Sequence, residues 1–120
     1  MTYEILYRSK TTLRNGWWNK PTLEGLSSTH ITLPDAVSND INQEVPLVDG
    51  LQGHALEVIF HRMNNYNENP LSVGHTNGGL QDWMNDNDLG HTSMSMFDVV
   101  RINDTYWLCM PSGWEKLGTN

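Results

Sequence analysis

The stretch SMFDVVRINDTYWLCMPSGWEKL, residues 95–117, decides the fold. It contains three short runs rich in β-branched, aromatic and aliphatic residues. The runs cover residues 95–102, 106–110 and 114–117. Two turn sequences separate them, Asn103-Asp104-Thr105 and Pro111-Ser112-Gly113. Short runs of this kind joined by tight turns are typical of antiparallel strands, so the stretch predicts a C-terminal β-meander.

Two further extended segments precede the meander. Residues 3–8 alternate along the chain, as a strand with two different faces does. One face would carry Tyr3, Ile5 and Tyr7, and the other Glu4, Leu6 and Arg8. The second segment is residues 29–33, which Pro34 ends.

The connections between these segments carry turn signals. Asn15-Gly16 lies between residues 12–14 and Trp17-Trp18, and both Asn and Gly tolerate the positive φ of a type I′ turn. We therefore expect a β-hairpin there. Residues 34–50 hold two prolines and several Asp and Asn residues without a period, which predicts an irregular connection.

The clearest helix covers residues 53–65, where Ala55, Val58, Ile59 and Met63 form an apolar stripe. The helix should end in the Asn-rich segment that leads to Pro70. Residues 66–92 are rich in Asn, Gly and Asp and predict a long loop with one helical turn at 80–84.

These elements define the fold class. Residues 1–120 form a single α+β domain with a mostly antiparallel sheet, either open or partly closed into a barrel. We expect one main helix to pack on the sheet and the β-meander to be the best-formed part of the sheet. Eleven aromatic side chains, five Trp, four Tyr and two Phe, supply enough apolar surface for a core.

Charge and cysteine content restrict the function classes. The net charge is −7 with only seven Lys and Arg residues, which disfavours binding to nucleic acid or to an anionic membrane and suits a basic partner. Cys109 is the single cysteine, so no intrachain disulfide can form. The first twenty residues lack a basic start followed by an apolar stretch, so we expect no signal peptide and a cytoplasmic protein.

Candidate metal ligands come from the five histidines. His54 and His61 are seven residues apart, on roughly one face of the predicted helix, and Asp82 in the loop could add a carboxylate. The chain has no tight spacing of the His-x-x-x-His kind, and we expect no cofactor.

Ser93, Ser95 and Asp98 could form a nucleophile with a helper, but no Gly-x-Ser-x-Gly motif surrounds either serine. We favour a structural role, in which these side chains bond to nearby backbone N–H groups at the start of a strand.

Trp17 and Trp18 are the candidate partner-binding residues. Adjacent residues on a strand face opposite ways, so at least one of the two should be exposed. An exposed Trp beside a turn is a good anchor for a protein partner.

Two segments together resemble the YodL-like family of small proteins of phages and mobile elements. The first is residues 56–64, LEVIFHRMN, and the second is residues 90–100, GHTSMSMFDVV. The positions that fall where that family places its closing strands are Tyr106, Cys109, Gly113-Trp114 and Leu117. The resemblance covers about a third of the chain and implies a fold and a genomic context, but no chemistry. The chain departs from the family at Phe97, where the family has Gly, and a positive φ would strain a Phe there.

We therefore expect a non-enzymatic interaction protein, an accessory protein of a phage or mobile element that binds another protein. The alternatives are a metal-assisted enzyme that uses His54, His61 and a loop carboxylate, and an acidic mimic of nucleic acid.

Overall fold

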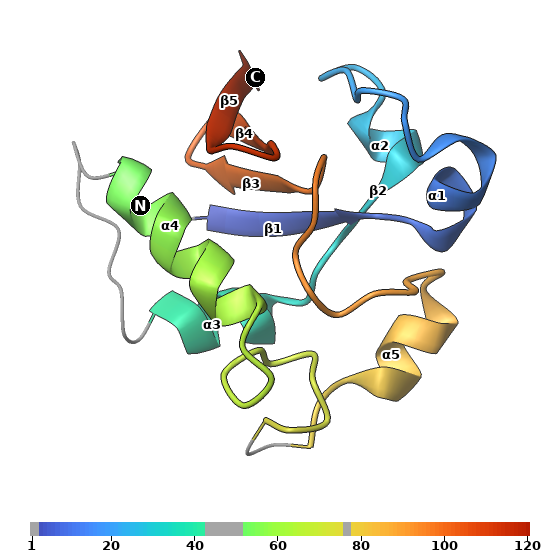
Figure 1. Cartoon of the computed structure of the whole chain (residues 1–120), viewed down its shortest axis with the longest axis vertical. Helices are drawn as coiled ribbons and strands as arrows, with labels where there is room; N and C mark the ends of the chain where they lie inside the picture. Colours follow the sequence, from blue (N-terminus) through green and yellow to red (C-terminus); the bar gives the residue numbers. More distant parts are fainter. Residues whose placement is uncertain (1–2, 43–51, 76–77) are drawn as a thin grey trace.

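A five-stranded antiparallel sheet forms the centre of the computed structural model, which describes residues 3–42, 52–75 and 78–120 (Figure 1). The strands are β1 (Tyr3–Arg8), β2 (His30–Thr32), β3 (Val99–Ile102), β4 (Thr105–Cys109) and β5 (Trp114–Thr119). Their order is β2-β1-β3-β4-β5, so the N-terminal strand pairs with β3 of the meander. In the described part of the chain the sheet is open. The α+β prediction is confirmed, in its open form.

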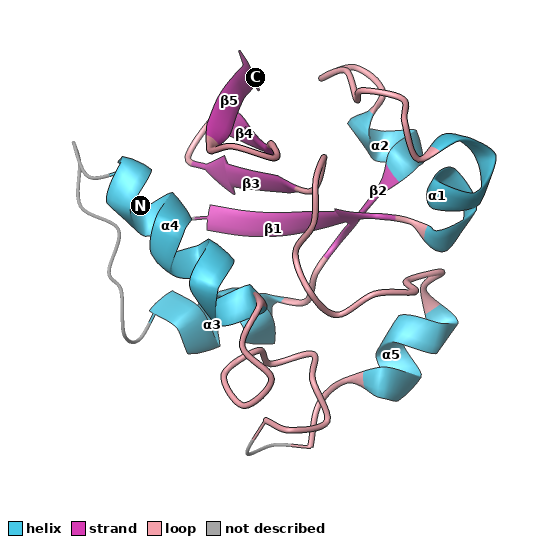
Figure 2. Ribbon diagram, in the orientation of Figure 1, coloured by secondary structure: helices cyan, strands magenta, loops and turns pink. Residues whose placement is uncertain are grey.

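Five helices surround the sheet (Figure 2). They are α1 (Lys10–Gly16), α2 (Leu26–Thr29), α3 (Asp35–Asn42), α4 (Gln52–Met63) and α5 (Gln81–Asp86). The predicted main helix is confirmed as α4, and the predicted helical turn at 80–84 is confirmed as α5. Within the described ranges, every helix is too short or too polar to reach across a lipid bilayer.

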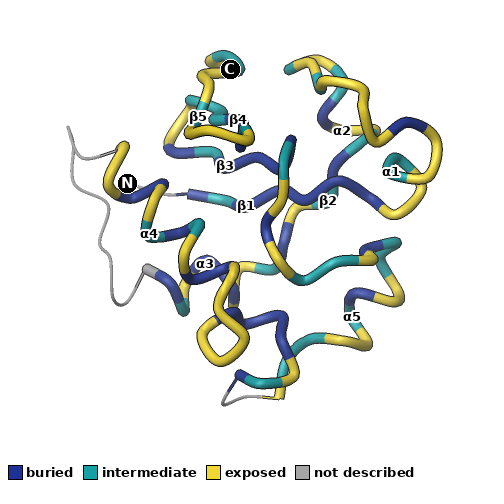
Figure 3. The backbone as a smooth tube through the Cα atoms, in the orientation of Figure 1, coloured by how far each residue is buried: buried dark blue, intermediate teal, exposed yellow. Residues whose placement is uncertain are grey.

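Five of the six residues of β1 are buried and Glu4 is partly buried, so most of this strand is dark blue in Figure 3. The face of Tyr3, Ile5 and Tyr7 belongs to the larger core cluster, to which α3 and α4 contribute. Those helices supply Val37, Ile41, Leu56, Ile59 and Met63. The opposite face carries Leu6, which packs in a second cluster with Leu26, Val99 and Leu108. The alternation predicted for residues 3–8 is therefore confirmed, with a core on each side.

The predicted hairpin at Asn15-Gly16 is wrong, because these residues end α1. Ser9 caps this helix: its hydroxyl accepts a hydrogen bond from the backbone N–H of Thr12 at 3.0 Å. A side-chain cap satisfies an N–H group that has no partner within the helix. Gly16 ends the helix, and its carbonyl accepts from the N–H of Asn19 at 3.0 Å.

The irregular connection predicted for residues 34–50 is also wrong in its first half, where α3 forms. Pro34 precedes the helix and Asp35 lies in its first turn, two features that favour a helix start. Val37 and Ile41 are four residues apart and fully buried, so one face of the helix packs in the core. Residues 43–50 of that prediction lie outside the described residues.

The meander is confirmed, but its first strand begins at Val99 rather than at Ser95. Phe97 has a φ of 73°, which places it in the left-handed region and outside any strand. A positive φ at this position is the conformation that glycine accommodates without strain. At the next turn, Asn103 has a φ of 53°, which suits Asn in a tight connection between strands.

Candidate functional site

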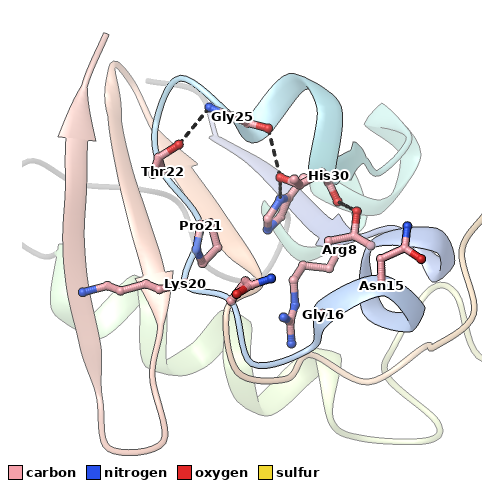
Figure 4. Close-up of a pocket in the computed structure, with 11 residues that line it drawn as sticks. Arg8, Asn15, Gly16, Lys20, Pro21, Thr22, Gly25 and His30 are labelled. Carbon is pink, nitrogen blue, oxygen red and sulfur yellow. Dashed lines mark hydrogen bonds between the residues drawn. The ribbon is translucent and has the colours of Figure 1, made fainter.

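A pocket of about 340 Å³ lies between α1, the segment that follows it, and the start of β2. Its lining residues are Arg8, Thr12, Asn15, Gly16, Asn19, Lys20, Pro21, Thr22, Gly25, Thr29 and His30. Figure 4 shows Arg8 and His30 together on one side of Pro21, while the Lys20 side chain extends to the other side. The lining contains two cationic side chains and no carboxylate.

Arg8 is the most deeply buried charged residue of this lining, with 3% of its surface exposed. Its guanidinium donates from Nη1 to the carbonyl of Trp17 at 2.6 Å and from Nη2 to the carbonyl of Met96 at 3.1 Å. The group also lies 5.2 Å from the centre of the Phe97 ring, within cation–π range. Burial lowers the pKa of Arg8, and the charge of Asp98 opposes this shift.

Asp98 organises the backbone behind the pocket and is completely buried. Its Oδ1 accepts from the backbone N–H of Arg8 at 2.9 Å. Its Oδ2 accepts from the N–H of Ser95 at 2.8 Å and from the Ser95 hydroxyl at 3.2 Å. The structural role is therefore confirmed for Asp98, whose side chain accepts from two backbone N–H groups and closes the turn before β3. The Ser95 side chain differs from the expectation, because it donates to Asp98 rather than accepting from a backbone N–H.

His91 is the fourth donor to Asp98, through Nε2 at 3.1 Å. Its ring stacks on Tyr7, with 4.7 Å between ring centroids and 9° between planes. Because a carboxylate oxygen can only accept, Nε2 carries the proton. The imidazole is thus held between a charged and an aromatic neighbour, and its position is fixed.

His30 connects the pocket to the strained turn. Its Nε2 lies 2.8 Å from the carbonyl oxygen of Phe97, and its Nδ1 lies 2.8 Å from the hydroxyl of Thr29. A carbonyl only accepts, so Nε2 donates and holds the backbone of Phe97 in place. Burial lowers the pKa of His30, while the hydrogen bond to Phe97 and the charge of Asp98 oppose this shift. His30 is therefore neutral at pH 7.

Trp17 and Trp18 lie in the segment that joins α1 to the pocket wall. The sequence predicts that at least one of the two is exposed. In the structure both are, with 57% and 62% of their surface exposed. Their rings meet edge to face, 5.8 Å apart at the centroids. The backbone beneath them is held by the hydrogen bond from Arg8 to the carbonyl of Trp17.

The predicted metal ligands are not brought together. His54 and His61 are both exposed on α4, and Asp82 is exposed on α5. Among residues 3–42, 52–75 and 78–120, no group of three or more His, Cys, Asp or Glu side chains is placed to hold a metal ion.

The sequence patterns considered above predict neither the pocket nor a binding role for Arg8. One signal could have found them. No Asp or Glu occurs between Ile5 and Leu23, whereas this stretch holds Arg8, Lys10, Arg14 and Lys20, four of the seven basic residues. This basic stretch of sequence carries several residues of the pocket lining and both exposed Trp rings. In the structure Glu115 pairs with Lys20, and the Asp88 carboxylate accepts from the backbone N–H of Thr11.

Comparison with known proteins finds no relative of this chain. No protein-family model matches the chain, and no significant match is found among curated proteins or solved structures.

Proposed function

We propose that this protein is a non-enzymatic interaction protein that binds a protein partner through Trp17 and Trp18. The observation that carries the proposal is the exposure of both indole rings, at 57% and 62%. Trp is the residue type most enriched at the energetic centres of protein interfaces. An exposed pair of rings in contact presents a larger apolar area than either ring would alone.

The rings are presented on an anchored backbone. The carbonyl of Trp17 accepts from the buried Arg8 at 2.6 Å, and the carbonyl of Gly16 accepts from Asn19 at 3.0 Å. A segment that is already ordered loses less conformational entropy on binding. This arrangement supports a binding role for the two rings.

The charge around the rings favours an acidic partner surface. Lys10, Arg14 and Lys20 flank Trp17 and Trp18 in the sequence, in a stretch without Asp or Glu. This differs from the basic partner that the net charge of −7 suggests, because a local interface depends on local charge. We expect the partner to offer an apolar pocket rimmed with carboxylates.

The resemblance to the YodL-like family supports a more specific role as an accessory protein of a phage or mobile element, acting in the cytoplasm. The left-handed Phe97 is consistent with the resemblance, because the family has Gly at this position and Gly adopts such a conformation freely. The proposed partner is then a host or viral protein.

Affinity capture with matched variants tests the proposal. The wild-type chain, the W17A/W18A double variant and Tyr66→Ala are immobilised and compared. Tyr66 is a suitable control because it is 65% exposed and lies after α4, far along the chain from the Trp pair. We expect a partner that binds wild type and Tyr66→Ala, and that binds W17A/W18A about 100-fold more weakly.

Two outcomes would contradict the proposal. One is a partner that binds all three proteins equally. The other is a short single-stranded oligonucleotide that binds wild type and quenches the fluorescence of the Trp pair, because exposed Trp rings beside basic residues can also stack on bases.

A further inference from the structure

The pocket beside α1 has an unusual charge for this protein. The whole chain has twice as many acidic as basic residues, 14 against 7. The eleven residues that line the pocket include Arg8 and Lys20 but no Asp or Glu. A concave site of one charge sign concentrates ions of the opposite sign. The pocket is therefore suited to anions, although the protein as a whole repels them.

Arg8 has hydrogen-bonding capacity that the protein does not use. Its Nε–H is buried and has no hydrogen-bond partner among the residues that the structure describes. The guanidinium donates two hydrogen bonds to backbone carbonyls, and among the described residues no carboxylate forms an ion pair with it. Leaving a buried donor unpaired costs free energy. The charge of Asp98 acts on the guanidinium without a direct ion pair, so the missing partner is an acceptor for Nε. An oxyanion would supply this acceptor, because its oxygens match the fork of the guanidinium.

We propose that this pocket is a binding site for a small molecule that carries a carboxylate or phosphate group, with Arg8 as the principal anion-binding residue. This site goes beyond the proposed protein-binding role, because the Trp17 and Trp18 side chains do not line it. The volume of about 340 Å³ is at the lower end of the range for small-molecule pockets.

The remaining lining residues have separable roles. Asn15 and Asn19 are exposed in the lining, where their side-chain amides can donate to a ligand. Lys20 is paired with Glu115 at 2.5 Å, but both side chains are about half exposed. Such a pair contributes little, so Lys20 can exchange Glu115 for a bound anion at small cost. His30 donates to Phe97 and acts as a fixed part of the wall.

Nuclear magnetic resonance titration of the full chain tests the site. One arm uses inorganic phosphate and the other acetate, both at pH 7 and at constant ionic strength maintained with sodium chloride. We expect saturable shifts of the Arg8 Nε–H signal and of the backbone amides of Gly16 and Asn19. The arm that saturates at lower concentration identifies the ligand group as phosphate or carboxylate.

Arg8 is buried and its substitution could unfold the protein, so the variants are placed on exposed residues. Asn19→Asp introduces a negative charge into the lining without a change of shape, and should weaken anion binding about tenfold. Asn85→Asp, on the exposed face of α5, makes the same charge change outside the pocket and should leave the affinity within about twofold of wild type. Shifts that do not saturate, an unmoved Arg8 Nε–H signal, or equal effects of the two variants would overturn the proposal.

Discussion

Phe97 offers a direct test of the strained turn that precedes β3. Its φ is 73°, its backbone N–H donates to the carbonyl of Cys109 at 2.7 Å, and its carbonyl accepts from His30 at 2.8 Å. Both sides of the residue are therefore held, and a substituted residue should keep the same backbone conformation. We expect Phe97→Gly to be more stable than Phe97→Ala, which is the reverse of the usual order.

The magnitude follows from the backbone conformation. A left-handed residue other than Gly costs about 1–2 kcal/mol, whereas Gly pays about 0.5–1 kcal/mol for its greater freedom in the unfolded chain. The balance favours Gly over Ala at position 97 by about 1 kcal/mol. Both variants lose the buried ring equally, at a cost of about 3–5 kcal/mol, so this loss cancels from their difference. The variant pair Glu57→Ala and Glu57→Gly, within the right-handed helix α4, should favour Ala by about 1 kcal/mol.

Urea unfolding of the four variants, followed by tryptophan fluorescence, measures both differences. Sucrose added equally to all samples keeps the Phe97 variants folded in the absence of urea. We expect the difference in free energy of unfolding between the Gly and Ala variants to have opposite signs at positions 97 and 57. The two differences should lie about 2 kcal/mol apart. If Ala is the more stable residue at both positions, the left-handed conformation of Phe97 is refuted.

Three further predictions concern titratable groups. His30 has a lowered pKa, so the folded state takes up its proton less readily than the unfolded chain, whose value is 6.5. Stability should therefore be complete above that pH and fall below it by up to about 1.4 kcal/mol per pH unit. Urea midpoints at pH 7.5 and 5.5 should show this loss in wild type and in His61→Gln but not in His30→Gln, and an unchanged pH dependence in His30→Gln would contradict it. Asp98→Asn should lower the free energy of unfolding by about 3 kcal/mol, because an amide cannot accept from all four donors. The control Asp104→Asn, at an exposed position, should lower the free energy of unfolding by about 0.5 kcal/mol or less, as measured by thermal unfolding. Equal losses for the two substitutions would refute the role of Asp98. Burial, with the charges of Asp98 and Glu57, raises the pKa of Cys109 to about 11. At pH 8 a disulfide reagent should modify the folded protein at least about 100-fold more slowly than the urea-unfolded chain, and equal rates would contradict this burial.

Local patterns predicted much of the fold. The alternation in residues 3–8, the apolar stripe of α4 and the turns of the meander all depend on spacing and on turn residues. These signals act over a few residues and are visible in a single sequence. Local turn chemistry failed at Asn15-Gly16, because Ser9, six residues earlier, caps a helix that includes both residues.

The candidate sites were less predictable. Trp17 and Trp18 were expected to include an exposed ring, and both are exposed. His54, His61 and Asp82 were candidate metal ligands, but among the described residues no group of three or more His, Cys, Asp or Glu side chains is placed to hold a metal ion. A shared helix face does not determine which loop folds against it. Arg8 was expected only as a residue on one face of the first strand, yet its side chain lines the pocket.

The sequence by itself determined the class of fold, the acidic balance and the basic stretch between Ile5 and Leu23, because these depend on composition and on short-range periodicity. The tertiary structure alone decided the environment of Arg8. That residue contacts the carbonyl of Met96, and its backbone N–H contacts Asp98, across about ninety residues of chain. The left-handed residue Phe97 is likewise held by Cys109 of β4 and His30 of β2, which are distant from it in the sequence or lie on another strand, so no local pattern encodes these contacts.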